Sequence, residues 1–380
     1  MSQAAPATPG KNVPAIKVDT VGYPLTWRKL AIFNVAPAGA VVKDETGKLA
    51  LTIEASEIVS KGVDEASRDA TWQVDFSRLQ TPGRYYLEVG GQKSDTFAIG
   101  AGVYREALRA ALKHFYFQRC RTKLEAPYAT WQGDTFARSG PCHAHEDVGW
   151  DYADYPQRKR KWQLQAGWHD AGNYSQYVPS TAPSAQALLA AYERHPELFK
   201  DGDGNLPESG NKVPDILDEA RYGLLWLLSM QEPDSGALRS REAVYDWDEG
   251  KAQDDRKVRW VAGIGTASTA KAASVLAVAA RVYKKWDAAF AARCERASRA
   301  AWAFIEKHPE GAPIELVIDS LSAGAFTPTL RESRGGATAT AVGDGTVVVV
   351  GGNTGPNVVA ETAEVFADTK VPPQAAGFVQ

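Results

Sequence analysis

The chain has 380 residues, enough for two or three domains, and its 44% hydrophobic and 23% charged residues are the proportions of an ordinary globular protein. Forty-three basic and forty-six acidic side chains leave a net charge of -3, so no basic surface indicates a nucleic-acid partner. No apolar run approaches the ~18 residues of a membrane span, and the small polar N-terminus lacks the apolar core of a signal peptide. Three cysteines without a C-x-x-C motif argue against a disulfide framework.

The first predicted domain is rich in strands. Residues 1–13 are small and polar and predict a disordered arm. Between 14 and 100, short strand-like segments such as KLAIFNV and RYYLEVG are separated by proline and glycine, as at the Thr81-Pro82-Gly83 turn. Short strands at this spacing over ~90 residues predict a small β-sandwich.

After Gly100 the hydrophobic period becomes helical, with apolar residues at Val103, Ala107, Leu108, Ala111, Leu112 and Phe115. Further helices are expected around 183–195, 214–230, 267–285 and 287–307. Long segments between them, rich in tryptophan, are interpreted as loops. Residues 101–308 therefore predict an all-α domain with elaborated loops.

Beyond residue 308 the composition changes again. Residues 309–330 are interpreted as a linker, and 331–380 as three or four short strands because β-branched runs alternate with glycine pairs. The segment resembles a single kelch or galactose-oxidase-type repeat. One such repeat cannot bury its own faces, since these architectures need about three or more.

The segment GWHDAGNY, residues 167–174, has one carboxylate at Asp170 and a carboxamide three residues later at Asn173. A pair of side chains at this spacing can hold one water molecule, but an amide oxygen is not basic enough to take its proton. A plain turn is the structural alternative, because aspartate, glycine and asparagine all favour turns.

Two groups of side chains suggest metal sites. Cys120, Cys142, His143 and His169, with His145 as a possible substitute, are the ligand types that zinc prefers, although buried cysteines and loop histidines are the alternative. Asp201, Asp203 and Asn205 place oxygen donors at alternating positions, which imitates the start of a calcium loop. Lys212 stands where an EF-hand has its bidentate glutamate, so a polar loop that caps the next helix is the alternative.

The aromatic residues divide by position. Trp226, Trp286 and Trp302 lie on predicted helical faces and are expected in the core. Trp131, Trp168 and Trp260, with Tyr174, are the candidates for stacking on sugar rings because they lie in the predicted loops near these motifs.

Four motifs together carry a resemblance to a known family: GWHDAGNY, FYFQRC, CHAHED and DGDGNLPESGNKVPDILDEARYGLLWLLSMQ. With them the chain resembles glycoside hydrolase family 9, in the cellulase branch that carries an immunoglobulin-like domain. The resemblance covers residues 14–308. It implies an immunoglobulin-like β-sandwich over 14–100, followed by a partial (α/α)6 domain over 101–308. It further implies an inverting endo-β-1,4-glucanase that acts on a β-1,4-linked glucan or oligosaccharide. Some members hold a structural zinc through ligands of the types described, and members bind calcium in loops.

Two departures from the family predict impaired catalysis. The family loop reads Asp-Ala-Gly-Asp, and its second aspartate is the general base; this position is Asn173 here. In addition, no residue of the chain matches the family's general acid, a glutamate near the end of the barrel. A non-catalytic carbohydrate-binding remnant or fusion chain, and an amino-sugar-specific exo-glycosidase, are the alternatives. Half of a barrel is also expected to leave the apolar side chains of Val275, Leu276 and Val278 without partners.

Overall fold

The computed structural model describes the side chains of residues 14–35, 37, 39–244 and 250–308, and the backbone of five short strands between 338 and 366. The chain divides into two compact units, Met1–Ala111 and Leu112–Gln380. The predicted arm at 1–13 and the predicted linker at 309–330 lie outside the described residues. Among the residues described, no helix is long and apolar enough to cross a membrane.

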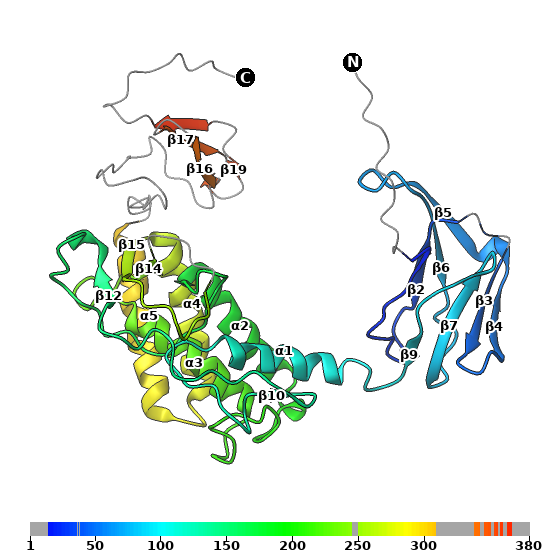
Figure 1. Ribbon diagram of the computed structural model, residues 1–380, viewed down its shortest axis with the longest axis horizontal. Coiled ribbons are helices and arrows are strands. Elements are labelled where there is room, and N and C mark those ends of the chain that lie inside the picture. Colours follow the sequence, from blue (N-terminus) through cyan, green and yellow to red (C-terminus); the bar gives the residue numbers. More distant parts are fainter. Residues whose placement is uncertain are drawn as a thin grey trace. The chain divides into compact units, whose positions relative to one another are not determined.

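The N-terminal unit is a sandwich of two antiparallel sheets (Figure 1). A 3-10 turn, η1 (Ala55–Glu57), leads into β5. In strand order, one sheet contains β1 (Ile16–Lys17), β2 (Leu30–Phe33), β6 (Ala70–Asp75) and β5 (Ile58–Val63). The other contains β4 (Leu49–Ile53), β3 (Ala40–Asp44), β7 (Gly83–Val89) and β8 (Gln92–Lys93), with β9 (Phe97–Ile99) also paired to β7.

One core joins the two sheets of the sandwich. Alternate residues point inward, as in β7, where Tyr85, Leu87 and Val89 are buried. They meet Phe33 and Val74 of the other sheet in a single hydrophobic cluster. The β-sandwich predicted for residues 14–100 is therefore confirmed.

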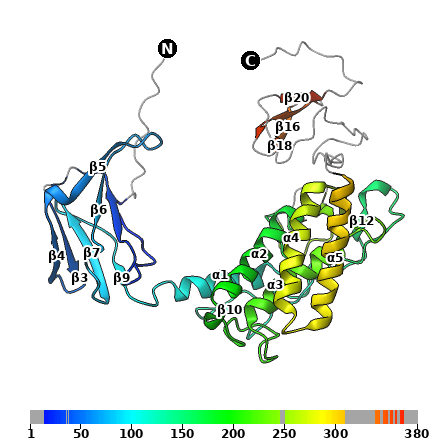
Figure 2. The ribbon, with the colours of Figure 1, turned by 180° about the vertical axis from the view of Figure 1, so that it is seen from behind.

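The second unit is built on helices. They are α1 (Arg105–Gln118, which begins in the first unit), α2 (Val178–Arg194), α3 (Asp215–Ser229), α4 (Thr266–Tyr283) and α5 (Ala288–Lys307), with 3-10 turns η2 (Tyr152–Asp154) and η3 (Pro196–Leu198). Helices α2 to α5 lie side by side (Figure 2) and share one hydrophobic core, which includes Leu189, Leu224 and Trp226. All five predicted helices are present, although α2 begins at Val178 and contains Pro183 in its interior.

The prediction of unpartnered apolar residues on α4 is wrong. Val275 and Leu276 are buried, and Val278 packs against the same core, because α4 contacts both α2 and α5. Trp226 is in the core as predicted and Trp286 is partly buried against it, but Trp302 is 58% exposed. Trp302 directly follows the buried Ala301 on α5, which turns its side chain ~100° away from the buried face.

A mixed sheet was not predicted. Its strand order is β12 (Val148–Asp151), β15 (Arg259–Ile264), β14 (Arg239–Val244) and β13 (Gln176–Tyr177); only the β12–β15 pair is parallel. Trp150 and Trp260 are partners across β12 and β15, and Trp131 lies on the hairpin of β10 (Thr130–Trp131) and β11 (Asp134–Thr135). These tryptophans are therefore in strands and not in loops. Such short strands show no clear period, and the partner of Trp150 in β15 is distant in the sequence.

The C-terminal strands form a separate arrangement. Strands β16 (Thr338–Val342), β17 (Thr346–Val350) and β20 (Ala363–Phe366) pair antiparallel, and β18 (Asn353–Gly355) pairs with β19 (Val358–Val359). The strand character predicted for this segment is confirmed, and its described residues form five strands where three or four were expected. Its kelch-like character stays a prediction.

Candidate active-site loop and metal centre

The segment Gly167–Tyr174 is attached to the end of α1. Gly167 accepts a hydrogen bond from the Cys120 amide at 2.7 Å, and the His169 amide donates to Gln118 at 2.9 Å. Gly167 has φ +88°, and a Cβ there would lie 1.8 Å from Oε1 of Gln176. Only glycine fits this approach, so the glycine that opens the motif has a packing reason as well as a conformational one.

The two predicted water-holding side chains have different environments. The Asn173 carboxamide oxygen accepts a hydrogen bond from the Ser175 amide at 3.1 Å, and the Asp170 amide donates to the Ser175 carbonyl at 2.8 Å. Asn173 therefore closes a turn on its own backbone, as the structural alternative anticipated for this residue type. Asp170 is exposed, and its carboxylate is the group of the two that can accept a proton.

A cavity of about 220 Å³ adjoins Asp170. Its wall comes from α1, from the start of α2 and from the loop: His114, Phe115, Gln118, Ser180, Thr181, Ser184, Trp168, His169 and Asp170. Asp170 is the one carboxylate among these described lining residues. The cavity therefore offers a base and several hydrogen-bonding groups.

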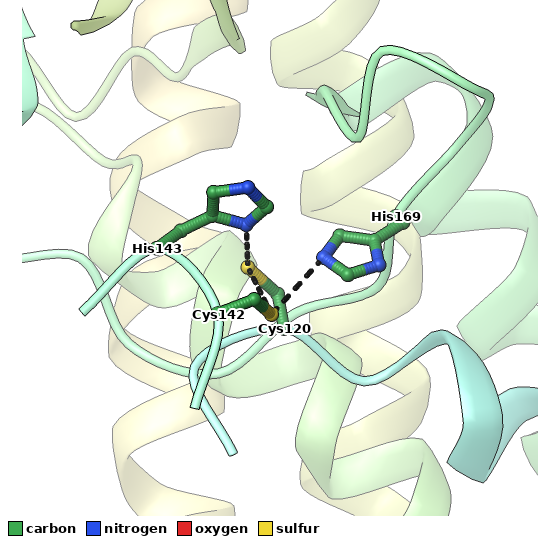
Figure 3. Close-up of side chains that lie close together, drawn as sticks. All are labelled: Cys120, Cys142, His143 and His169. Atoms are coloured by element: carbon green, nitrogen blue, oxygen red, sulfur yellow. Dashed lines mark hydrogen bonds between the residues drawn. The ribbon is translucent and has the colours of Figure 1, made fainter. Parts of the chain in front are cut away.

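Four side chains converge beside the loop from three separate segments (Figure 3). The Sγ atom of Cys120 lies 3.9 Å from Sγ of Cys142 and 3.2 Å from Nδ1 of His143, and Sγ of Cys142 lies 3.4 Å from Nε2 of His169. All four ligand atoms lie within 4.8 Å of one another, and all four residues are buried. A tetrahedron with Zn–S of about 2.3 Å and Zn–N of about 2.0 Å has edges of roughly 3.3–3.8 Å. The donor set and its spacing fit a tetrahedral metal ion.

Charged groups surround these ligands. Arg138 donates to Sγ of Cys142 at 3.0 Å, Arg121 donates to Sγ of Cys120 at 3.6 Å, and Nε2 of His143 lies 3.1 Å from Asp255. The hydrogen bond with Cys120 lowers the pKa of Cys142, while burial raises the pKa of the Cys120 thiol.

The histidines divide between the metal centre and its surroundings. Burial lowers the pKa of His169, which keeps the neutral ring that a metal requires. His145, predicted as a substitute ligand, is outside the group of four, and His143 takes the position.

The predicted calcium loop is held by protein groups. Asp201 accepts hydrogen bonds from the amides of Gly210 and Lys212 at 2.5 and 2.7 Å, and Asp203 accepts one from Lys200 at 2.7 Å. The side-chain amide of Asn205 donates to Pro127 at 3.0 Å. These bonds organise the loop, but none of them caps α3, whose N-cap residue Pro214 has no side-chain cap hydrogen bond, and calcium binding here stays a prediction.

Two of the four predicted sugar-stacking residues, Trp168 and Trp260, are almost wholly buried. Trp168 is 5% exposed, and its indole N–H donates to Oε1 of Glu219 at 2.8 Å. Trp260 is 6% exposed and packs edge-to-face against Tyr155. Trp168 nevertheless lines the cavity beside Asp170, so sugar stacking by either residue stays a prediction. Trp131 and Tyr174 are half-buried and remain candidates.

Sequence reasoning missed the polar network behind the loop. Arg259 is fully buried and donates to the carbonyls of Asn173 and Tyr174, and Arg121 pairs with the buried Glu242 at 2.5 Å. One signal was present: Arg259 is a charged residue at the start of the apolar run WVAGI, four residues after Asp255.

Comparison with known proteins agrees with this architecture. Residues 104–325 match the glycosyl hydrolase family 9 model, and residues 11–94 match the cellulase N-terminal ig-like domain model. Endoglucanase D of Acetivibrio thermocellus is 29% identical over 298 residues, which cover 77% of this chain and 46% of that protein.

Solved structures agree as well. A metagenome-derived glycoside hydrolase family 9 endoglucanase superposes with a TM-score of 0.66 at 36% identity, covering 77% of this chain and 54% of that one. A zinc-binding triple mutant of the family 9 endoglucanase J30 gives 0.70 at 29% identity, covering 81% and 57%. The chain spans about half the length of the curated relatives that it matches. It belongs to glycosyl hydrolase family 9, with a cellulase-type immunoglobulin-like domain at its N-terminal end.

Proposed function

We propose that this chain carries the glucan-binding, water-holding face of an inverting endo-β-1,4-glucanase whose hydrolytic step is impaired by Asn173. The observation that carries the proposal is the position of Asp170, an exposed carboxylate on the wall of the 220 Å³ cavity in a family 9 fold. Endoglucanase activity of Endoglucanase D and of other relatives supports the substrate class.

The chemistry requires two carboxyl groups on opposite sides of the glycosidic bond, ~6.5–9.5 Å apart, so that a water molecule fits between one of them and the sugar. Asp170 can orient this water and accept its proton. The Asn173 oxygen can accept a hydrogen bond but not a proton, and in the structure it already accepts the Ser175 amide. Asp170 therefore serves as a substitute base, in a position that the family pattern assigns to a water-positioning partner.

The direct test is a reducing-sugar assay on carboxymethylcellulose, with chito-oligosaccharides as the amino-sugar comparison. We expect hydrolysis near background and weak binding to cello-oligosaccharides, measured by titration calorimetry. Asp170→Asn should weaken neither fold nor binding greatly and should remove the residual hydrolysis. Robust activity that survives Asp170→Asn would contradict the assignment, and absence of binding would favour a remnant without carbohydrate function.

We also propose that Cys120, Cys142, His143 and His169 hold one structural zinc ion. Support comes from the tetrahedral spacing and burial of the four ligands, and one structural relative is described as a zinc-binding mutant of a family 9 endoglucanase. Thiolates favour zinc over calcium or magnesium. A closed set of four protein ligands leaves no position for substrate, so the ion would tie the three segments together and take no part in hydrolysis.

Elemental analysis of protein purified in metal-free buffer tests this proposal, and we expect about one equivalent of zinc per chain. Cys142→Ser should lose it, whereas Cys294→Ser, at a buried cysteine outside the cluster, should retain it. Unchanged zinc in the Cys142 variant would remove the proposal. The same analysis reports whether calcium accompanies the loop of Asp201, Asp203 and Asn205.

A further inference from the structure

The guanidinium group of Arg259 holds the backbone of the glycosidase loop. Arg259 begins β15 and has no solvent exposure. Its Nη1 donates to the Tyr174 carbonyl at 2.9 Å, and its Nη2 donates to the Asn173 carbonyl at 3.0 Å. One planar fork therefore holds two consecutive peptide groups through two nitrogens in a fixed relative position, whereas a lysine would have to do so from a single nitrogen on a more flexible stem.

The same guanidinium is connected to the metal centre. Its Nη2 lies 2.6 Å from Oδ2 of Asp255, and that oxygen lies 3.1 Å from Nε2 of His143. His143 directs its other nitrogen, Nδ1, toward Sγ of Cys120 at 3.2 Å. The side chains of His143, Asp255 and Arg259 are all fully buried. A metal-ligand histidine that donates its second N–H to a carboxylate is the usual means of fixing the ring's orientation.

The loop needs an external tie of this kind. Tyr174 has φ +54°, in the left-handed region that non-glycine residues rarely occupy. Such a conformation persists only where the surroundings determine it. Three hydrogen bonds hold Tyr174 in this conformation. Arg259 donates to the carbonyls of Asn173 and Tyr174, and the Tyr174 hydroxyl donates to the Gly250 carbonyl at 2.5 Å.

We propose that Asp255 and Arg259 are positioning residues that couple occupancy of the metal centre to the position of the 170–174 loop. With its ring held as a metal ligand, His143 would orient Asp255, and Asp255 would orient the guanidinium that holds the loop carbonyls. The metal centre thereby sets the place of Asp170 without contacting substrate. This inference rests on the proposed zinc site and is independent of whether the chain hydrolyses glucan.

Hydrogen exchange followed by mass spectrometry on the full chain tests the coupling, with zinc content measured first. The readout is exchange at the amides of Asp170, Tyr174 and Ser175, which are hydrogen-bonded within the loop. In the unmodified protein, removal of zinc by a chelator should accelerate this exchange by roughly 5- to 150-fold.

Three variants separate coupling from general damage. Arg259→Lys should retain one equivalent of zinc, yet its loop should exchange fast with or without the ion. Asp255→Asn should bind zinc roughly 10- to 100-fold more weakly in chelator competition, and saturating zinc should slow its loop much less than in the unmodified protein. Arg239→Lys is the matched control, because Arg239 is also buried but pairs with Glu232 and Asp151 and not with the loop. Its loop should respond to zinc as in the unmodified protein.

The outcomes are distinct. If the unmodified protein binds no zinc, the zinc proposal fails and the coupling fails with it, which the metal analysis alone reveals. Zinc could instead bind and slow loop exchange in Arg259→Lys and Asp255→Asn as much as in Arg239→Lys. In that case the coupling is wrong, but the zinc site is retained. Should Arg259→Lys fail to fold, the near-isosteric Asp255→Asn decides.

Discussion

Asn173 differs from an aspartate by one heavy atom of the side chain. That atom decides whether the side chain can accept a proton, while the shape of the turn stays the same. A carboxylate at this position would still accept the Ser175 amide through one oxygen, so the turn does not require asparagine. The turn and the proton acceptor are thus separable properties of the same residue. The side chain that remains at the cavity, Asp170, is exposed and carries the only carboxylate among the described residues of its wall.

We predict that Asn173→Asp leaves hydrolysis near background. Restoring a base contributes roughly 10²–10⁴-fold only when leaving-group protonation is also provided, and no second carboxylate lines the described part of the cavity. The measurement is the reducing-sugar assay, with Asp170→Asn in the Asn173→Asp background as control. Strong hydrolysis by the single variant that the double variant loses would show that an acid acts from elsewhere.

Asp218 gives a prediction on pH. Burial raises its pKa from 3.8 to about 6, while a 3.0 Å hydrogen bond from Asn211 opposes this rise. The folded state therefore holds the proton of Asp218 more tightly than the unfolded state. Ionisation of Asp218 lowers the free energy of unfolding, and this loss is absent below about pH 4 and complete above about pH 6. A shift of about two pH units corresponds to at most about 3 kcal/mol.

Asp218→Asn should therefore remove a fall in stability between about pH 4 and pH 6. The free energy of unfolding of the variant should rise relative to that of the unmodified protein as pH increases through this range. Urea unfolding of both proteins across this range measures the difference between their free energies of unfolding. Any loss of zinc at low pH affects both proteins equally and therefore cancels in this difference. Curves that stay parallel from pH 4 to pH 8 would contradict the prediction.

At the scale of elements, helix α3 supports the loop through a glycine. Gly223 lies on α3, and a Cβ there would lie 2.2 Å from Cζ3 of Trp168. Trp168 precedes the metal-ligand candidate His169, and its indole is fixed by Glu219. Close packing of the indole on the bare helix backbone therefore positions the loop.

We expect Gly223→Ala to destabilise the chain. Overpacking costs typically 1–3 kcal/mol, roughly, which outweighs the ~1 kcal/mol that alanine gains in a helix. Ser274→Ala on the exposed side of α4 is the control and should change stability by less than about 0.5 kcal/mol. Chemical denaturation measures both, and a Gly223→Ala protein as stable as its parent would overturn the packing argument.

At the scale of the whole chain, the two units have separate cores. The sandwich buries Phe33, Val74 and Leu87 in one cluster, and the helical unit buries Leu224, Trp226 and Leu276 in another. The four metal-ligand candidates all belong to the helical unit. Stabilisation by a bound ion acts only on the unit whose folded state binds it.

We predict two unfolding transitions in calorimetry, of which zinc chelation lowers only one. The transition that shifts should be the one that Cys142→Ser also lowers, whereas Cys294→Ser should leave the zinc dependence unchanged. A single transition that moves as a whole on chelation would mean that the two units unfold together.

Much of this protein was determined by local sequence. Strand alternation and proline–glycine punctuation predicted the sandwich, and a helical period predicted the five helices; Asp, Gly and Asn indicated the turn at 170–173 as the alternative to a water-holding pair. The family motifs predicted which four residues would converge near the loop. The sandwich, the helices and the turn are visible in sequence because backbone preferences and side-chain periodicity act over a few residues.

Other features were decided by tertiary structure alone. The pairing of β12 with β15 joins segments more than a hundred residues apart, and it buries Trp260, which the local sequence assigned to a loop. The burial of Trp168 against Gly223 and Glu219, and the path from His143 through Asp255 to Arg259, likewise depend on distant segments. Burial and buried ion pairs are properties of the packed chain, since a side chain's solvent exposure depends on which remote segments cover it.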